Sequence, residues 1–206
     1  VIAVAELEGA IYCEDGLDVK KLLKYRKSNG SIIGFPGSKE IKGENAGIEV
    51  ECDILIPAAL QNQITIKNAD RIKAKIIAEA ANGPITPDAE EVLLKKGIMI
   101  IPDIYINAGG VTVSYFEWLK NLSHVRFGRM NKRFEEFSQN NMIDVMEKAT
   151  NKSISKRERS NVVRGASEID LVNSGLEDTM IEAYQSIREA KKKKNIPDLR
   201  TAAFYV

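Results

Sequence analysis

Short β-rich runs alternate with helical patterns along the first 110 residues, and this alternation restricts the fold more than any other feature of the chain. The strand-like runs are residues 1–5, 52–59, 75–78 and 98–102. Helical patterns occupy residues 18–29, where Gly30 follows as a stop, and residues 87–96, where Gly97 follows. Strand–helix–strand repetition is typical of parallel sheets covered by helices. The sequence therefore predicts an α/β fold with a doubly wound parallel sheet.

The pattern changes after Gly110, beyond which the periodic segments are helical. Helices are predicted over residues 111–122, 131–150 and 166–195, and residues 199–206 read as a helix that is cut off. Residues 151–160 (NKSISKRERS) are expected to form a charged, weakly structured connector. Two long helices joined by a charged turn suggest a projecting helical hairpin.

Charge and hydropathy argue against several classes of partner. The chain has 30 Lys and Arg against 29 Asp and Glu, a net charge of +1, so it has no bulk attraction to nucleic acid or to anionic membranes. Its apolar runs are far shorter than the roughly 20 residues of a membrane span. The two cysteines, Cys13 and Cys52, fit neither a disulfide framework nor a metal site. We therefore expect no nucleic-acid, membrane or metal partner.

Glu6 directly follows the first strand-like run. In a doubly wound sheet, ligands bind beyond the carboxyl ends of the strands, so residues at these positions are candidates for a site. A carboxylate here would hydrogen-bond the ribose hydroxyls of a dinucleotide and disfavour a 2′-phosphate. A solvated carboxylate at a strand end explains the residue equally well. The glycine-rich turn that would decide between the two is expected about 20 residues upstream, before Val1.

Small and amide side chains follow the later strands. Residues 57–59 (Pro-Ala-Ala) would let a flat ligand approach the backbone closely, while Asn82 with Gly83, and then Asn107, follow the next two strands. Their amides could bind a nicotinamide carboxamide, which needs both a donor and an acceptor. Ordinary turn chemistry also explains such loops. The single histidine, His124, could act as a general base, but no partner motif lies near it, so a structural or surface role is expected.

A family resemblance adds to this reading. Residues 107–118 (NAGGVTVSYFEW) closely resemble the signature of glutamate dehydrogenases. Leucine- and phenylalanine-type dehydrogenases share the strand-end asparagines but not the Ser-Tyr-Phe-Glu-Trp continuation followed by a helical insertion. The resemblance extends over residues 1–206 and is dense to about residue 130. Its other segments are residues 34–36 (GFP), 52–59 (CDILIPAA), 78–84 (AEAANGP) with Thr86-Pro87, 165–168 (GASE) and 198–203.

The resemblance implies a Rossmann-like cofactor domain and the oxidation of L-glutamate to 2-oxoglutarate and ammonia, with hydride passing to NAD or NADP. It also implies that Glu6 faces the adenosine ribose, and that Asn82 and Asn107 hold the nicotinamide end. Ser114 would touch the substrate carboxylate. Ala58, Ala59 and Gln63 would line the cofactor groove, and Gly83 is a further cofactor-binding candidate.

The family's catalytic lysine, its partner aspartate and its carboxylate-binding lysines lie in an N-terminal substrate domain, and no residue of this chain matches them. No catalytic residue is therefore assigned. The first strand of the Rossmann-like sheet and its glycine-rich turn are missing as well. We expect the chain to be a C-terminal fragment of a longer enzyme and to be inactive alone.

The resemblance also divides the chain into parts. Residues 1–126 correspond to a partial NAD(P)-binding domain, residues 127–163 to a helical antenna, and residues 164–206 to a pivot helix with a C-terminal helical segment. In antenna-bearing members, which are mostly mitochondrial, the antenna bundles about a three-fold axis of a hexamer and transmits regulation. The resemblance thus implies a homo-oligomer, expected to be a hexamer, with nucleotide effectors in the mitochondrial matrix; the cytoplasm is the alternative.

Departures from the family pattern bear on cofactor choice and regulation. Ala5 stands where glycine is usual, and Leu7 replaces a small polar residue beside the ribose site, so the choice between NAD and NADP stays open. Ile169 and Asn173 stand where animal enzymes carry a lysine and a histidine used in nucleotide regulation. Losing a cation and an imidazole should weaken triphosphate binding. We therefore expect inhibition by GTP to be reduced or absent.

The sequence leaves two alternatives open. The chain could belong to a dehydrogenase of another amino acid, which the absent substrate domain would decide. It could also be a non-catalytic nucleotide-binding and oligomerisation module. The upstream coding sequence distinguishes these, because a glycine-rich turn and a lysine-bearing substrate domain would indicate an enzyme.

Overall fold

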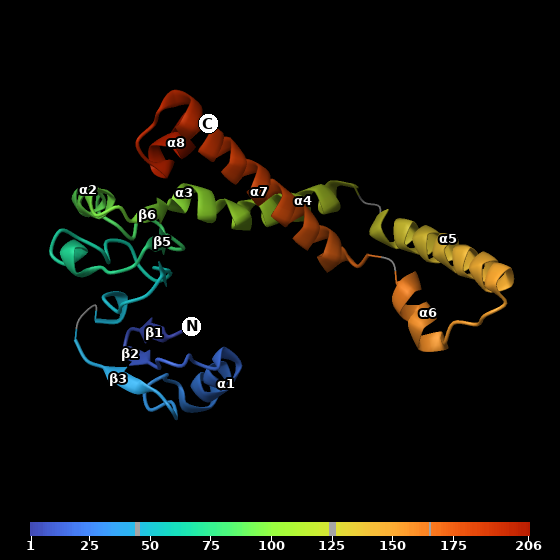
Figure 1. Ribbon diagram of the computed structural model, residues 1–206, viewed down its shortest axis with the longest axis horizontal. Coiled ribbons are helices and arrows are strands. Elements are labelled where there is room, and N and C mark those ends of the chain that lie inside the picture. Colours follow the sequence, from blue (N-terminus) through green and yellow to red (C-terminus); the bar gives the residue numbers. More distant parts are fainter. Residues whose placement is uncertain (44–45, 124–126, 165) are drawn as a thin grey trace. The chain divides into compact units, whose positions relative to one another are not determined.

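The computed structural model describes residues 1–43, 46–123, 127–164 and 166–206, and the chain divides into two compact units (Figure 1). The first unit contains Val1–Asn107 and Ser186–Val206, and the second contains Ala108–Gln185. His124 and Gly165, both singled out in the sequence, lie outside the described residues.

The first unit contains the predicted parallel sheet. Strands β4 (Ile54–Leu55), β5 (Ile76–Ala78) and β6 (Met99–Ile101) lie in the order β4-β5-β6, and all their pairings are parallel. They are shorter than the predicted runs but lie within them. The α/β class and the Rossmann-like parallel arrangement are thereby confirmed.

Helix α2 (Pro87–Lys95) connects β5 to β6, as the sequence predicts, with Thr86 as its N-cap and Pro87 at its first position. Its buried face, Ala89 and Leu93, packs into the apolar core of the sheet. A short 3₁₀ helix, η2 (Ala69–Arg71), precedes β5 and contacts α2. Helix α2 therefore begins on the carboxyl side of β5, where a site would form, whereas η2 lies on the amino side.

The first strand-like run forms a different sheet from the one expected. Strand β1 (Ala3–Glu6) pairs antiparallel with β2 (Gly9–Tyr12), which pairs antiparallel with β3 (Lys39–Ile41), so residues 1–5 add nothing to the parallel sheet. The loop between Glu6 and Gly9 has two residues, and Gly9 has a φ of +147°, so the chain reverses at once instead of crossing over. The run is also half-buried and exposed, not buried.

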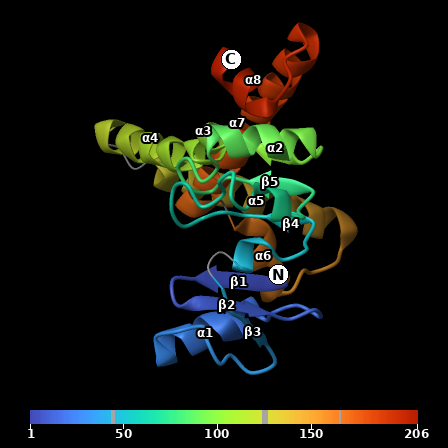
Figure 2. The same cartoon turned by 90° about the vertical axis from the view of Figure 1, so that its left-hand side faces the viewer.

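Helix α1 (Val19–Asn29) packs on this antiparallel sheet (Figure 2). It begins at Asp18, whose side chain accepts a hydrogen bond from the Lys21 amide, and ends at Gly30, which has a φ of +76°. Both boundaries were predicted. The small core beneath it contains Ile11, Leu17, Leu22 and Ile32. Another 3₁₀ turn, η1 (Ala46–Ile48), contacts β1 and β2.

The second unit is helical. It contains α4 (Ala108–Ser123), α5 (Phe127–Thr150), α6 (Lys156–Val163) and the first part of α7 (Glu168–Lys194). The predicted weakly structured connector, residues 151–160, is wrong in its second half, because α6 begins there. Ser155 and Glu158 form a reciprocal capping box at its start.

Arg159 explains why α6 forms in a segment so rich in charge. Its guanidinium contacts three residues of α5: Asn140, Asp144 and Glu147. The pattern of alternating charges therefore reflects a helix that is held against α5 by ionic contacts. The periodicity of residues 151–160 alone does not reveal this.

The end of the chain returns to the first unit, where α8 (Leu199–Tyr205) contacts β6 and α3 (Asp103–Ile106). Asp198 caps α8 by accepting a hydrogen bond from the Thr201 amide at 2.7 Å. Among the described residues, none of the helices combines the length and apolar character that crossing a bilayer requires. The same residues contain no cluster of three or more His, Cys, Asp or Glu side chains suited to a metal ion.

Candidate functional site

Two strand-end asparagines predicted from separate loops are in direct contact. Asn82 follows β5 and Asn107 follows α3, and Asn107 Nδ2 donates a hydrogen bond to Asn82 Oδ1 at 2.6 Å. This bond leaves Asn82 Nδ2 as a donor and Asn107 Oδ1 as an acceptor, neither of which has a partner within the described ranges. The pair therefore offers a ligand one amide donor and one amide acceptor.

A neighbouring segment brings Gln63 to the same edge of the sheet. The Asn62 amide donates to the Gly83 carbonyl at 2.9 Å, and the Ile64 amide donates to the Pro84 carbonyl at 2.9 Å. These bonds place Gln63 next to the loop that carries Asn82. Its side-chain Nε2 donates to the Gln61 carbonyl at 3.1 Å, and the residue is half-buried.

Ala58 and Ala59 complete this edge of the sheet. Both are exposed and follow β4, and the adjacent Pro57 carbonyl accepts a hydrogen bond from the Ala80 amide at 3.0 Å. Because their side chains are single methyl groups, a flat ligand could lie close to the backbone here. The carboxyl ends of β4, β5 and β6 thus gather Ala58, Ala59, Gln63, Asn82, Gly83 and Asn107.

A cluster of charged side chains that the sequence did not indicate lies next to these loops, because its member Asp103 accepts a hydrogen bond from the Gly83 amide. We call it the Arg200 cluster: Arg200 of α8 contacts the carboxylates of Glu79, Glu90 and Asp103. The exposed fractions of these side chains are 21% for Arg200 and 0%, 16% and 20% for the three acids. Three acids converge on one cation in a site largely shielded from water.

The protonation energetics of this cluster follow from its burial. Burial raises the pKa of the Glu79 carboxyl, and the Asp103 amide and the Arg200 charge offset only part of this effect. Burial also opposes the charge of Arg200, but hydrogen bonding to Glu90 and the charge of Glu79 outweigh it and raise the pKa of the guanidinium. Among the described residues, Glu79 Oε1 is a buried atom without a hydrogen-bond partner.

Two predicted residues lie outside this group. Glu6 is the last residue of β1 in the antiparallel sheet, and Arg26 Nε lies 3.0 Å from Glu6 Oε1. Ser114 belongs to α4 in the second unit, where it is exposed and its hydroxyl donates to the Gly110 carbonyl at 3.0 Å. Glu6 is therefore a carboxylate with a neighbouring cation.

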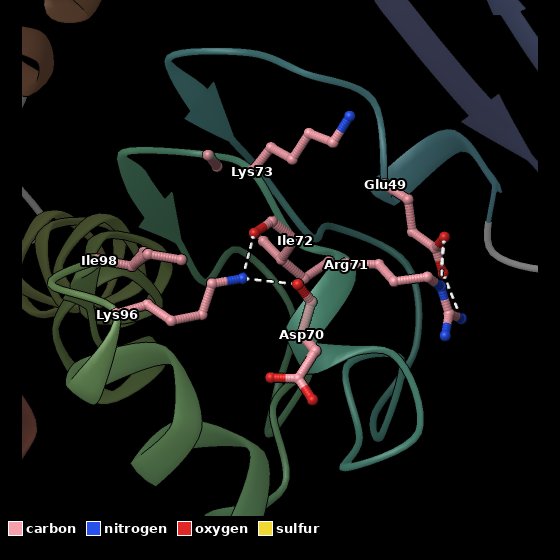
Figure 3. Close-up of a pocket in the computed structure, with 8 residues that line it drawn as sticks. Glu49, Asp70, Arg71, Ile72, Lys73, Lys96 and Ile98 are labelled. Carbon is pink, nitrogen blue, oxygen red and sulfur yellow. Dashed lines mark hydrogen bonds and ion pairs between the residues drawn. The ribbon is translucent and has the colours of Figure 1, made fainter.

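A cavity of about 530 Å³ lies at the opposite, amino ends of the parallel strands (Figure 3). Its basic side chains already have protein partners. Arg71 is bound to both carboxylate oxygens of Glu49, and Lys96 Nζ donates to backbone carbonyls, including that of Ile72 at 2.7 Å. Because ligands of doubly wound sheets bind at the carboxyl ends, we assign the candidate site to the loops around Asn82 and Asn107.

The family model described as glutamate/leucine/phenylalanine/valine dehydrogenase matches residues 1–169. The chain belongs to this family. The sequence is 55% identical over 205 residues to the mitochondrial glutamate dehydrogenase of Dictyostelium discoideum, covering 100% of this chain and 41% of that protein. It is 43% identical to a probable glutamate dehydrogenase of Sinorhizobium fredii, covering 99% and 46%. The chain thus spans less than half the length of these curated relatives.

Solved structures agree with the fold. A glutamate dehydrogenase from Peptoniphilus asaccharolyticus is 29% identical, with a TM-score of 0.64 over 99% of this chain and 37% of that one. The hetero-hexameric glutamate dehydrogenase from Thermus thermophilus, at 22% identity and a TM-score of 0.65 over 98% and 38%, shares the fold. The resemblance to glutamate dehydrogenases that residues 107–118 and the strand-end segments indicate is therefore confirmed.

Membership of this family implies a nicotinamide cofactor, and the residues present fit one. A primary carboxamide carries one acceptor and one donor group. The Asn82–Asn107 pair presents the complementary donor and acceptor. Methyl side chains at Ala58 and Ala59 leave room for a flat group beside the backbone.

Proposed function

We propose that this chain is the cofactor-binding and regulatory part of a glutamate dehydrogenase, which oxidises L-glutamate to 2-oxoglutarate and ammonia. The observation that carries the proposal is the hydrogen bond between Asn82 and Asn107 at the carboxyl ends of the parallel strands. Two side-chain amides from separate loops are hydrogen-bonded there, and one amide donor and one amide acceptor remain for the carboxamide of a ligand. The names of the relatives support L-glutamate as the substrate.

Each predicted residue has a proposed part in positioning. Asn82, Gly83 and Asn107 hold the nicotinamide end, and Ser114 touches the substrate carboxylate. When bound, the nicotinamide accepts the hydride from the α-carbon of the substrate. The contribution of these residues is to fix the ring, because holding two reactants in the correct geometry can supply about 7–11 kcal/mol of the barrier. The residues proposed to line the groove are Ala58, Ala59 and Gln63.

The choice between NAD and NADP depends on Glu6 and its neighbour. A carboxylate at this position hydrogen-bonds the ribose hydroxyls and repels a 2′-phosphate, whereas a nearby arginine accommodates that phosphate. Arg26 lies 3.0 Å from Glu6, and about half of its side chain is exposed. We propose that the pair tolerates both cofactors.

The substrate is tested with the protein expressed from its complete coding sequence. Reduction of NAD and NADP is followed with L-glutamate, L-leucine, L-phenylalanine and L-valine at matched concentrations. L-Glutamate should give the highest kcat/KM. A higher value with one of the other three would instead indicate a dehydrogenase of that amino acid, and no reduction with any of them would indicate a non-catalytic module.

The asparagine pair is tested by replacing Asn82 or Asn107 with alanine. Each variant should bind NADH about tenfold more weakly, since each loses roughly one buried hydrogen bond to the ligand. The control is Asn29→Ala, at the end of α1, where the amide bonds the Tyr25 carbonyl. NADH affinity that is unchanged in both test variants would remove the asparagines from the site.

Assembly, regulation and location follow from the family resemblance. We propose that residues 1–126, 127–163 and 164–206 act as cofactor domain, antenna, and pivot with C-terminal segment, in a homohexamer of the mitochondrial matrix; the cytoplasm is the alternative. The mitochondrial relative supports this location. Because Ile169 and Asn173 offer no cation to a triphosphate, GTP should inhibit weakly or not at all. Inhibition at low micromolar GTP would contradict this regulation.

A further inference from the structure

Asp103 links the two loops of the candidate site. Its Oδ2 accepts a hydrogen bond from the Gly83 amide at 2.8 Å, and its backbone carbonyl accepts one from the Asn107 amide at 2.8 Å. One residue therefore contacts both the loop of Asn82 and the backbone of Asn107. The orientation of the Asp103 side chain determines whether the first of these bonds can form.

Arg200 holds that orientation together with the Ile104 amide, which donates to Asp103 Oδ1 at 2.8 Å. Arg200 Nη1 donates to Asp103 Oδ1 at 2.9 Å, which leaves Oδ2 directed at Gly83. Its Nη2 donates to Glu79 Oε2 at 2.7 Å, and that same oxygen accepts the Asp103 amide at 2.9 Å. Arg200 thus fixes Asp103 both directly, through its carboxylate, and indirectly, through Glu79.

The geometry of this contact requires a guanidinium. Nε donates to both carboxylate oxygens of Glu90 at 2.9 Å, so three nitrogens of one planar group serve three acids. A lysine keeps the charge, but its single ammonium cannot reproduce this fixed fork. If Arg200 were removed, the negative charges of Glu79, Glu90 and Asp103 would lie close together without a neutralising cation. The partly exposed Asp103 would then turn toward water.

We propose that Arg200 is a positioning residue for the nicotinamide end of the site: by fixing Asp103, it fixes the Asn82–Asn107 pair. This inference rests on the proposed function. Its effect is confined to one end of the cofactor, because the adenosine candidate, Glu6, lies on the antiparallel sheet and is paired with Arg26. A merely structural role would weaken every part of the site alike.

The test compares two ligands that differ only in the nicotinamide end. Arg200→Lys, Arg200→Met and Asp103→Asn are introduced into the protein expressed from its complete coding sequence, and the Kd values for NADH and for ADP-ribose are measured by calorimetry. The matched control is Arg71→Met, which breaks an arginine–glutamate pair with two 2.7 Å bonds at the amino ends of the strands.

For the Arg200 and Asp103 variants, the Kd for NADH should rise about tenfold while that for ADP-ribose stays within about twofold. Their kcat should fall about 100-fold, since a displacement of about 1 Å costs this much, and lysine should not restore it. Arg71→Met should leave both Kd values and kcat unchanged. If Arg200→Met does not fold, Arg200→Lys and Asp103→Asn test the positioning role instead.

Equal losses of NADH and ADP-ribose affinity would overturn the positioning role and leave a structural one. Unchanged NADH affinity and kcat in folded Arg200→Lys and Asp103→Asn would overturn it as well. Failure of the proposed function has a different result: the unaltered protein would then not bind NADH, or it would reduce NAD and NADP best with an amino acid other than L-glutamate.

Discussion

Replacing Lys96 with methionine should destabilise the parallel-sheet region far more than the same replacement at its neighbour, Lys95. Lys96 Nζ donates to the carbonyls of Asp70 at 2.8 Å and Ile72 at 2.7 Å (Figure 3), and it makes a longer contact with the carbonyl of Ala69 at 3.4 Å. These carbonyls lie at the end of η2, where a helix leaves its acceptors unsatisfied. Methionine keeps the apolar stem of the side chain but donates no hydrogen bond.

The magnitude follows from these contacts. A hydrogen bond to a charged group contributes about 1.5–3 kcal/mol when it is buried. Because water can reach part of the site, we take the lower end for the two short bonds and expect a loss of about 2–3 kcal/mol. Lys95 lies 3.6 Å from Glu91 one helical turn away, with 78% of its side chain exposed. Such a pair contributes about 0.3–0.5 kcal/mol.

The measurement is hydrogen–deuterium exchange of peptides that cover β5 and β6, converted to free energies of opening. Fluorescence is unsuitable, because the single tryptophan, Trp118, lies in the second unit. The opening free energy should fall by about 2 kcal/mol more in Lys96→Met than in Lys95→Met, as the difference between the two contributions requires. Equal losses would refute the view that Lys96 stabilises the end of η2.

Other perturbations test separate parts of the first unit. Arg26→Ala should raise the NAD:NADP ratio of kcat/KM about tenfold, because Glu6 would repel a 2′-phosphate unopposed; an unchanged ratio would exclude Arg26 from cofactor choice. Burial raises the pKa of the Glu79 carboxyl above its ordinary 4.5. The protonated carboxyl therefore stabilises the folded state fully below pH 4.5, and this stabilisation is lost as the pH rises through the raised pKa. The melting temperature of Glu79→Gln should therefore rise relative to that of the unaltered protein as the pH is raised above 4.5, and a difference that stays constant with pH would contradict the raised pKa. Gly47→Ala would place a β-carbon 2.5 Å from the β-carbon of Ala5, a clash that should cost about 1–3 kcal/mol of stability. The melting temperature should therefore fall by several degrees. An unchanged melting temperature would show that the backbone moves and relieves the clash.

The parallel sheet was predictable because its strands are apolar runs with clear stops. The Thr86-Pro87 start and the glycine at position 97 define α2, and the apolar strands on either side pair as expected. The first strand was not predictable in the same way. Its run is as apolar as the others, but the two-residue turn before Gly9 sends it into a hairpin. The third strand of that sheet, Lys39–Ile41, has two charged residues out of three and gives little strand signal.

The candidate site was only partly predictable. The rule that ligands bind at the carboxyl ends of parallel strands selected Asn82 and Asn107, and the structure brings them into contact. Nothing in the sequence selected Arg200, since its partners Glu79, Glu90 and Asp103 lie 121, 110 and 97 residues away along the chain. Local patterns of charge and hydropathy carry no information on such a pairing.

The same separation affects how the protein is made. A ribosome adds about 5–20 residues per second, so Arg200 is synthesised roughly 5–25 seconds after the three acids that it contacts. During that interval the nascent chain can form its sheet and α2, while Glu79, Glu90 and Asp103 lack the cation that they contact in the folded protein. If Arg200 positions Asp103 as proposed, the binding loops reach their final form only when α8 docks. A chain that stalls or is cleaved before position 200 would resemble the finished domain in its sheet and differ from it at the binding loops.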